Sequence, residues 1–188
     1  MINNLKQILP LLEFKESWVY ELLILQRKKD NPHLVNNSNV RTIKVYNIRS
    51  KEYLEKKMDE IIKLCELFNA RAYIKLGPID TSKLGYEIIK YTIEKMKNKD
   101  YDFSHILNKA QGNITSVKKR WIVDIDEIEY VDKIIAAIPK ESYICTIPTK
   151  NGVHVITSPF RIDEFATHQD IYYKCEIKKS NPTLLYCK

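Results

Sequence analysis

Two carboxylates spaced two residues apart follow an apolar run in the second half of the chain. Residues 120–127 are Arg-Trp-Ile-Val-Asp-Ile-Asp-Glu, so one isoleucine separates Asp124 from Asp126. Because side chains alternate between the two faces of an extended strand, both aspartates project from one face, and Trp121, Val123 and Ile125 project from the other. Neighbouring carboxylates repel each other unless a cation, a shared proton or water compensates them. A divalent metal ion is the compensation that supports chemistry.

A turn sequence further along the chain carries a histidine, in the segment Pro148-Thr149-Lys150-Asn151-Gly152-Val153-His154. Asn-Gly predicts a two-residue turn between two antiparallel strands. With that register Lys150 opposes Val153 and Thr149 opposes His154, which places a hydroxyl beside an imidazole and a lysine near the tip. These groups offer hydrogen bonds and positive charge to a phosphate. The alternative is a half-buried histidine in an ordinary hairpin.

The first half of the chain alternates between predicted helices and strands. Apolar residues at three-four spacing indicate helices, and runs of branched and aromatic residues indicate strands. The predicted helices cover residues 3–16, 51–69 with Ser50 as the cap, 81–98 opened by Thr81 or Ser82, and 103–110, and the predicted strands cover 18–26, 40–48 and 70–76. Turn-forming residues at 30–32 and 36–39 predict that the first two strands form a long hairpin. Residues 111–113 are predicted to be a linker.

The second half predicts the order β-α-β-β-α-β, with a further strand at the end. The predicted strands cover residues 120–126, 143–148, 153–157, 171–177 and 183–187, and the predicted helices 128–138 and 159–168. This order is that of ferredoxin-like and RNA-recognition-like (RRM-like) folds, in which helices cover one sheet face and leave the other for a site. We therefore expect an α+β protein with an N-terminal α/β lobe at residues 1–113 packed on an RRM-like lobe at 114–188.

The composition favours a polyanionic partner and an intracellular setting. The chain has 188 residues and a formal net charge of +7, with its basic residues in short clusters that suit nucleic acid or nucleotides, or simply form solvated faces. The four cysteines stand far apart without zinc-ligand spacing, which favours a reducing compartment and buried thiols. The apolar stretch at Ile8–Leu12 is too short to span a membrane. We expect a cytoplasmic protein with no membrane partner.

Together these motifs resemble the catalytic region of the archaeo-eukaryotic primase superfamily, the primase-polymerases. The resemblance rests on a strand that ends in Asp-x-Asp, a helix, a strand, a turn with Gly-x-His on the returning strand, a second helix and a terminal hairpin. The resemblance covers residues 118–187 well. It covers the N-terminal part only in outline, as an α/β lobe packed beside the RRM-like lobe with a cleft between them. The family often has serine two residues before the histidine, where this chain has Gly152.

The resemblance implies a metal-dependent nucleotidyltransferase that synthesises or extends an oligonucleotide on a template. Asp124 and Asp126 take the places of the Mg²⁺ or Mn²⁺ ligands, and His154 that of the residue that contacts the phosphates of the incoming nucleotide. Two ions, roughly 3.5 to 4 Å apart in such sites, activate the attacking hydroxyl and neutralise the triphosphate. The partners that the resemblance implies are nucleoside triphosphates, single-stranded or primer-template nucleic acid, and a helicase or partner subunit.

Further residues receive roles from the same resemblance. Glu176 is the candidate third metal ligand by strand parity, although the lysines that flank it also allow a surface ion pair. Thr149 approaches the nucleotide, Lys150 or Arg161 steadies its phosphates, and Lys118 and Arg120 follow the template backbone. The candidate base-stacking aromatics are Trp121, Tyr172 and Tyr173, with Trp121 favoured as core by its parity.

Three other functions remain open. The main alternative is a degenerate primase-fold or RRM-like module that binds nucleic acid or nucleotide without polymerising it. Phosphatases of the haloacid-dehalogenase type also begin with Asp-x-Asp after an apolar strand, but Glu127 and Ile128 fit poorly the threonine or valine usual there. The last is an interaction protein with a solvated Asp-x-Asp.

Overall fold

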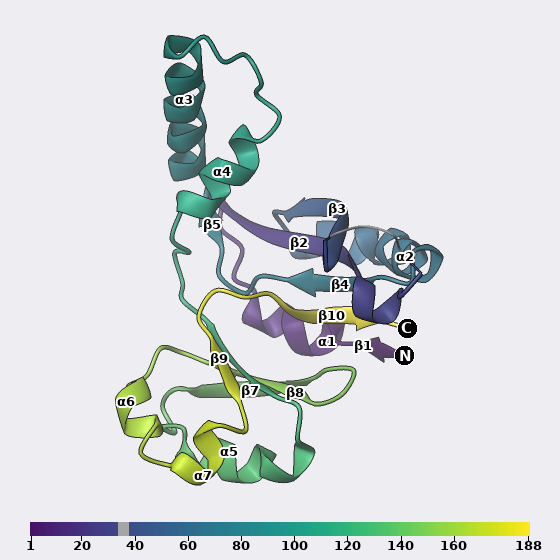
Figure 1. The fold of residues 1–188 in the computed structure, drawn as a ribbon, viewed down its shortest axis with the longest axis vertical. Coiled ribbons are helices and arrows are strands. Elements are labelled where there is room, and N and C mark those ends of the chain that lie inside the picture. The colour runs from purple at the N-terminus through teal and green to yellow at the C-terminus, as the bar shows by residue number, and fades with distance from the viewer. Residues whose placement is uncertain (34–37) are drawn as a thin grey trace.

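The computed structural model of the protein describes residues 1–33 and 38–188, which form two antiparallel sheets and seven α-helices (Figure 1). The predicted α+β class is confirmed. The turn predicted at residues 36–39 lies partly outside the described residues. Within the described ranges, no helix is both long enough and apolar enough to cross a membrane.

The first sheet has the strand order β1-β10-β4-β2-β3, with the short β5 beside β2. Its strands are β1 (Ile2–Asn3), β2 (Trp18–Arg27), β3 (Val40–Ile48), β4 (Arg71–Ile74), β5 (Ile79–Asp80) and β10 (Thr183–Cys187). The predicted hairpin of β2 and β3 is confirmed, with Tyr20 opposite Ile48 at one end and Arg27 opposite Val40 at the other. Strand β2 is buried along most of its length, whereas β3, at the edge of the sheet, is mostly exposed.

The helices of this half match their predictions to different degrees. Helix α2 (Lys51–Leu67) is confirmed, and the Ser50 hydroxyl accepts a hydrogen bond from the Tyr53 amide as the predicted cap. The predicted helix at 3–16 is only α1 (Leu5–Ile8) and the 3₁₀-helix η1 (Leu9–Leu11), because Pro10 cannot continue an α-helix. A further 3₁₀-helix, η2 (Lys28–Asp30), follows β2.

Two helices form an arm beyond β5 (Figure 1). Helix α3 (Thr81–Lys97) begins at Thr81, as predicted. Its cap is Asp80, whose carboxylate accepts hydrogen bonds from the amides of Ser82 and Lys83. Helix α4 (Ile106–Asn113) includes the residues predicted to be a linker, 111–113. That prediction is wrong because the C-terminal turn of α4 packs back on α3, where the Asn113 amide donates to the Tyr91 hydroxyl.

The second sheet has the strand order β7-β8-β6-β9. Its strands are β6 (Trp121–Ile125), β7 (Tyr143–Pro148), β8 (Val153–Thr157) and β9 (Glu176–Lys178), and its helices are α5 (Val131–Ala137), α6 (Ile162–Phe165) and α7 (Gln169–Tyr172), with the 3₁₀-helix η3 (Ile128–Tyr130) before α5. The bounds of β7 and β8 match the prediction. The single helix predicted at 159–168 is the pair of short helices α6 and α7, and only the end of the strand predicted at 171–177 is extended.

The predicted terminal hairpin is wrong, because β9 and β10 join different sheets. Strand β9 pairs with β6, whereas β10 pairs with β4 and β1 in the first sheet. All five residues of β10 are buried, and such a strand needs neighbours on both edges and cover on both faces. After β9 in the second sheet, the chain thus returns to the first sheet as β10, its last strand (Figure 1).

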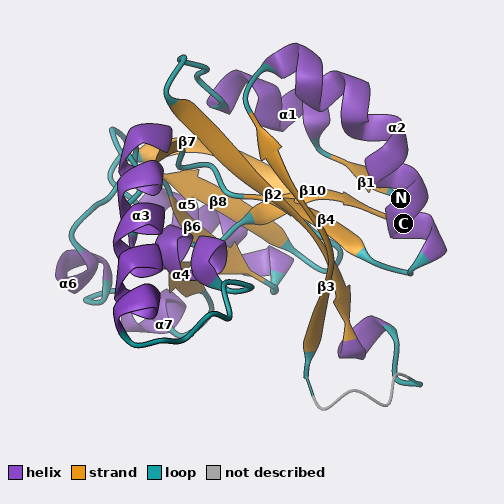
Figure 2. Ribbon diagram, turned by 90° about the horizontal axis from the view of Figure 1, so that it is seen from above, coloured by secondary structure: helices purple, strands orange, loops and turns teal. Residues whose placement is uncertain are grey.

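Two apolar clusters lie on the two faces of the second sheet. Val123, Ile125 and Val155 pack against α5, α6 and α7, on the side away from the first sheet. Ile122 and Ile156 instead belong to the cluster that contains the core of the first sheet, including Leu22 and Ile74. Figure 2 shows both sheets and the α1–α2 cover from above. Since Asp124 has the parity of Ile122, its side chain faces the first lobe, as strand alternation predicts.

Candidate functional site

Three polar side chains form a row across the second sheet. Asp124 on β6 lies directly opposite His154 on β8 and directly opposite Glu176 on β9. Opposed residues of antiparallel strands share a face, so the row stands on the face without helices. The predicted nucleotide histidine and the predicted third acid thus flank the first aspartate of the Asp-x-Asp motif.

Both carboxylate oxygens of Asp124 have positively polarised partners. His154 Nε2 lies 3.3 Å from Oδ1, and Lys178 Nζ lies 2.5 Å from Oδ2. Burial alone would raise the pKa of Asp124, but the hydrogen bonds and charges of His154 and Lys178 outweigh it and lower the pKa from 3.8 to about 2. Asp124 is therefore ionised at neutral pH and available to a cation.

His154 is held by a residue of the other sheet. The ring is 8% exposed, and its Nδ1 lies 2.9 Å from the Thr183 hydroxyl on β10. An ionised carboxylate only accepts hydrogen bonds, so Nε2 donates to Asp124, and the other ring nitrogen, Nδ1, is paired with the Thr183 hydroxyl. Thr183 was not predicted, because its position depends on the return of β10 to the first sheet.

The predicted register of the hairpin is wrong. His154 lies opposite Ile147 rather than Thr149, and Pro148 lies opposite Val153. The turn is thus centred one residue earlier than the Asn-Gly pair, and the Thr149 hydroxyl accepts a bond from the Gly152 amide instead of meeting the imidazole. The shift moves the pairing by two positions along β7, so the side chains keep their faces.

The hairpin turn lies against the end of β6 at Gly152, where there is no room for a side chain. A Cβ atom at Gly152 would lie 2.0 Å from the carbonyl oxygen of Ile125 and 2.8 Å from Cα of Asp126. The glycine does not adopt a positive φ, so close approach to the end of β6 and not a left-handed turn requires it. A serine here, as in the resembled family, would meet the same clash.

The row borders a cleft of about 390 Å³ that is lined by residues of both sheets. Six of the predicted site residues line it, and the opposite wall comes from β2, η2, β4 and the start of β10. The predicted lining residues are Asp124, Asp126, Thr149, Lys150, His154 and Glu176; those that sequence reasoning missed include Arg27, Lys29, Arg71, Tyr73 and Lys178. Asp126 is exposed just beyond the end of β6, and Glu176 is exposed on β9.

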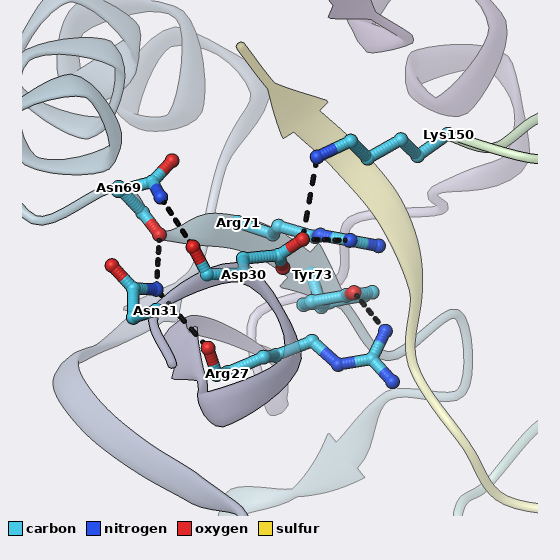
Figure 3. A network of polar contacts seen from close by, with 7 residues as sticks. All are labelled: Arg27, Asp30, Asn31, Asn69, Arg71, Tyr73 and Lys150. Atoms are coloured by element: carbon cyan, nitrogen blue, oxygen red, sulfur yellow. Dashed lines mark hydrogen bonds and ion pairs between the residues drawn. The ribbon is translucent and has the colours of Figure 1, made fainter. Parts of the chain in front are cut away.

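Cations line the wall that faces the carboxylates. Arg71 Nη2 lies 2.6 Å from Oδ1 of Asp30, and Lys150 Nζ from the other lobe lies 3.3 Å from the same oxygen (Figure 3). Burial alone would raise the pKa of Asp30, but Arg71 and Lys150 together lower it. Arg27 donates to the Tyr73 hydroxyl on the same wall. The sequence signal at this wall is an arginine at the end of an apolar strand, since Arg27 is the last residue of β2 and Arg71 is the first residue of β4.

Asparagines hold the turn that presents Asp30. The Asn69 amide group donates to the Asp30 carbonyl oxygen, and the Asn31 amide group donates to the carbonyls of Arg27 and Asn69 (Figure 3). Asn69 has a φ of 44°, a conformation that asparagine tolerates better than most residues. The Asp30 carboxylate is thus placed by backbone contacts and not by its ion pairs alone.

Three predicted residues lie outside the lining of the cleft. Arg161 is exposed and pairs with Asp163 and Glu164 of its own helix region. Lys118 pairs with Glu13, and Arg120 has a buried Nε without a hydrogen-bond partner. The aromatic candidates also lie elsewhere: Trp121 packs on Phe160, and Tyr172 and Tyr173 contact each other.

The carboxylates suit a divalent metal ion by their chemistry. Asp124, Asp126 and Glu176 line one cleft and offer the hard oxygen ligands that Mg²⁺ and Mn²⁺ prefer. Among the described residues, no three His, Cys, Asp or Glu side chains already form a metal-binding group. A cation nevertheless occupies the space between two of them, since Lys178 Nζ lies 3.1 Å from Glu176 Oε2 and also contacts Asp124. The donor set therefore fits a cation.

Comparisons with protein-family models, with curated proteins and with solved structures found no match.

Proposed function

We propose that the protein is a metal-dependent nucleotidyltransferase of the primase-polymerase type, which adds nucleotides to an oligonucleotide on a template. The observation that carries the proposal is the division of one cleft between carboxylates and cations. Asp124, Asp126 and Glu176 line it on the second lobe, while Arg27 and Arg71 line it on the first. A nucleoside triphosphate with its metal ion needs both kinds of wall.

The second sheet supports this proposal by its strand order. Numbered within the β-α-β-β-α-β succession, the order β7-β8-β6-β9 is second-third-first-fourth, all antiparallel. This is the arrangement expected of a ferredoxin-like or RRM-like lobe, in which the first and third strands are central. Asp124 and His154 lie on these central strands, on the face that helices leave free.

The side chains of the cleft have distinct tasks in this reaction. Arg27, Arg71 and Lys150 bind the phosphates, for which guanidinium groups supply paired donors and the ammonium a mobile charge. His154, whose two ring nitrogens pair with Asp124 and Thr183, positions the Asp124 carboxylate at the base of the cleft. Asp124, Asp126 and Glu176 would hold Mg²⁺ or Mn²⁺, and a bound ion neutralises the triphosphate and lowers the pKa of the attacking hydroxyl.

A second candidate function is nucleotide or nucleic-acid binding without turnover. The observation that favours it is the position of Lys178, whose ammonium compensates Asp124 and Glu176 without a metal. In this case the cleft would bind phosphates through its cations alone. The two candidates share a ligand and differ in the reaction.

The experiment that separates them is nucleotide incorporation on a primed and an unprimed template with Mn²⁺ or Mg²⁺. We expect incorporation by the wild type and none by the double variant Asp124→Ala, Asp126→Ala. The matched control is Asp132→Ala with Asp163→Ala, which removes two exposed carboxylates away from the cleft. Equal incorporation by the wild type and the cleft variant would refute the proposal, and nucleotide binding without incorporation by the wild type would establish the second candidate.

A further inference from the structure

Lys178 occupies the cation position of the carboxylate row. It lies opposite Ile122 on the strand pair β6–β9, two pairs away from Asp124 and Glu176 and on the same face, and its side chain runs back along the sheet to reach both. The side chains of Lys178 and Asp124 are 22% and 20% exposed, so their ion pair is shielded from most of the solvent. The Glu176 side chain is 73% exposed.

We propose that Lys178 is a built-in competitor of the metal ion, so that a divalent cation binds Asp124 and Glu176 only when the ammonium group withdraws. The inference rests on the proposed function, because it assigns the metal to the same carboxylates. It deepens that function by naming the residue that controls occupancy of the site.

The competition follows from the positive charge of the Lys178 ammonium group and from its contact with the same carboxylates that would bind the metal ion. A divalent ion and an ammonium group cannot share the oxygens of Asp124 at contact distance, because two cations so close together in a half-buried site repel strongly. The lysine can leave at modest cost, since its flexible stem carries a single point charge rather than a fixed fork of donors. The exposed Glu176 can follow either cation. Lys178 therefore lowers metal affinity without removing a metal ligand.

The experiment measures Mn²⁺ binding to the full chain by the electron paramagnetic resonance signal of the free ion. We expect Lys178→Met to bind Mn²⁺ roughly tenfold more tightly than the wild type, corresponding to about 1.4 kcal/mol. The matched control is Lys179→Met, which removes the same charge one residue away, where Nζ lies 5.2 Å from the centre of the Trp121 ring. Addition of Asp124→Asn to Lys178→Met should abolish the gain.

A second measurement avoids dependence on the folding of a variant. The rate of acetylation of Lys178 in the wild type, followed by mass spectrometry, should rise several-fold at saturating Mn²⁺, while that of Lys179 stays constant. Mn²⁺ affinities of wild type and Lys178→Met that agree within twofold, or an equal gain in Lys179→Met, would overturn the inference and leave the proposed function standing. If neither the wild type nor Lys178→Met bound Mn²⁺ through Asp124, both would fall.

Discussion

Gly152 lies against the backbone of Ile125, so close that a Cβ atom would stand 2.0 Å from the Ile125 carbonyl oxygen. The Ile125 carbonyl and the Gly152 backbone are both held in the sheet and its turn, so neither can rotate away from an added Cβ atom. We therefore expect Gly152→Ala to lower the free energy of unfolding by about 3 kcal/mol, the scale of severe overpacking. Urea denaturation measures this loss, which should come with a displaced His154.

The control for this substitution lies elsewhere in the same chain. A Cβ atom at Gly85, within α3, meets nothing within 4 Å. Gly85→Ala should therefore stabilise the protein by roughly 0.5 to 1 kcal/mol through helix propensity. A Gly152→Ala variant as stable as the wild type would show that the hairpin tolerates a wider turn.

Two buried threonines provide a matched test of the histidine contact. The Thr183 hydroxyl bonds His154 Nδ1, whereas the Thr157 hydroxyl is buried with no hydrogen-bond partner, and both residues are 0% exposed. Thr183→Val should lower the free energy of unfolding by about 1 to 2 kcal/mol, because it leaves Nδ1 unpaired. Thr157→Val should be neutral or stabilising in the same denaturation experiment. Equal losses in both variants would mean that the hydroxyl at 183 contributes only its volume.

Local patterns in the sequence were enough to predict one wall of the cleft. Strand alternation placed Asp124 on the free face of its sheet, and the Asn-Gly signal located the hairpin that carries His154, although its register was wrong by one turn position. Glu176 was placed by parity alone and does lie opposite Asp124. These features depend on residues close together in the chain or on neighbouring strands, where periodicity and turn chemistry are informative.

The other wall was not predictable in the same way. Arg71 faces the cleft only because β10 crosses into the first sheet and because Ile122 and Ile156 join the core of that lobe. Such contacts join residues far apart in the chain and leave no periodic signal. Arg161 was predicted to contact the phosphates because it lies close to His154 along the chain. In the fold it pairs locally with Asp163 and Glu164 instead.

The lowered pKa of Asp124 predicts a specific dependence of stability on pH. A carboxylate whose pKa is lower in the folded than in the unfolded state stabilises the fold above its unfolded pKa, and this stabilisation is lost as the pH falls through the folded pKa. For Asp124 the window runs from pH 3.8 down to about 2. The wild type should lose on the order of 2 kcal/mol relative to Asp124→Asn across it.

Unfolding by urea at a series of pH values checks this dependence. The control is Asp132→Asn, an exposed aspartate of α5, which should follow the wild type. A constant difference between wild type and Asp124→Asn across the window would mean that His154 and Lys178 do not stabilise the ionised carboxylate.

The buried pair of Asp30 and Arg71 predicts a link between stability and anion binding. Asp30→Asn leaves Arg71 9% exposed without its carboxylate, and loss of one partner of a buried ion pair costs about 3 kcal/mol. Asp163→Asn, which breaks the exposed pair with Arg161, should cost no more than about 0.5 kcal/mol. Thermal denaturation measures both losses.

Arg71 and Lys150, once released from Asp30, become partners for a phosphate chain. Inorganic tripolyphosphate should therefore raise the melting temperature of Asp30→Asn more than that of the wild type, because the added anion replaces the missing carboxylate. Combination of Asp30→Asn with Lys150→Met should reduce this stabilisation, whereas combination with Lys140→Met, an exposed lysine outside the cleft, should not. An equal effect of tripolyphosphate on the wild type and on Asp30→Asn would mean that phosphate binds away from Arg71. It would then contradict the proposed role of Arg71 in binding the triphosphate.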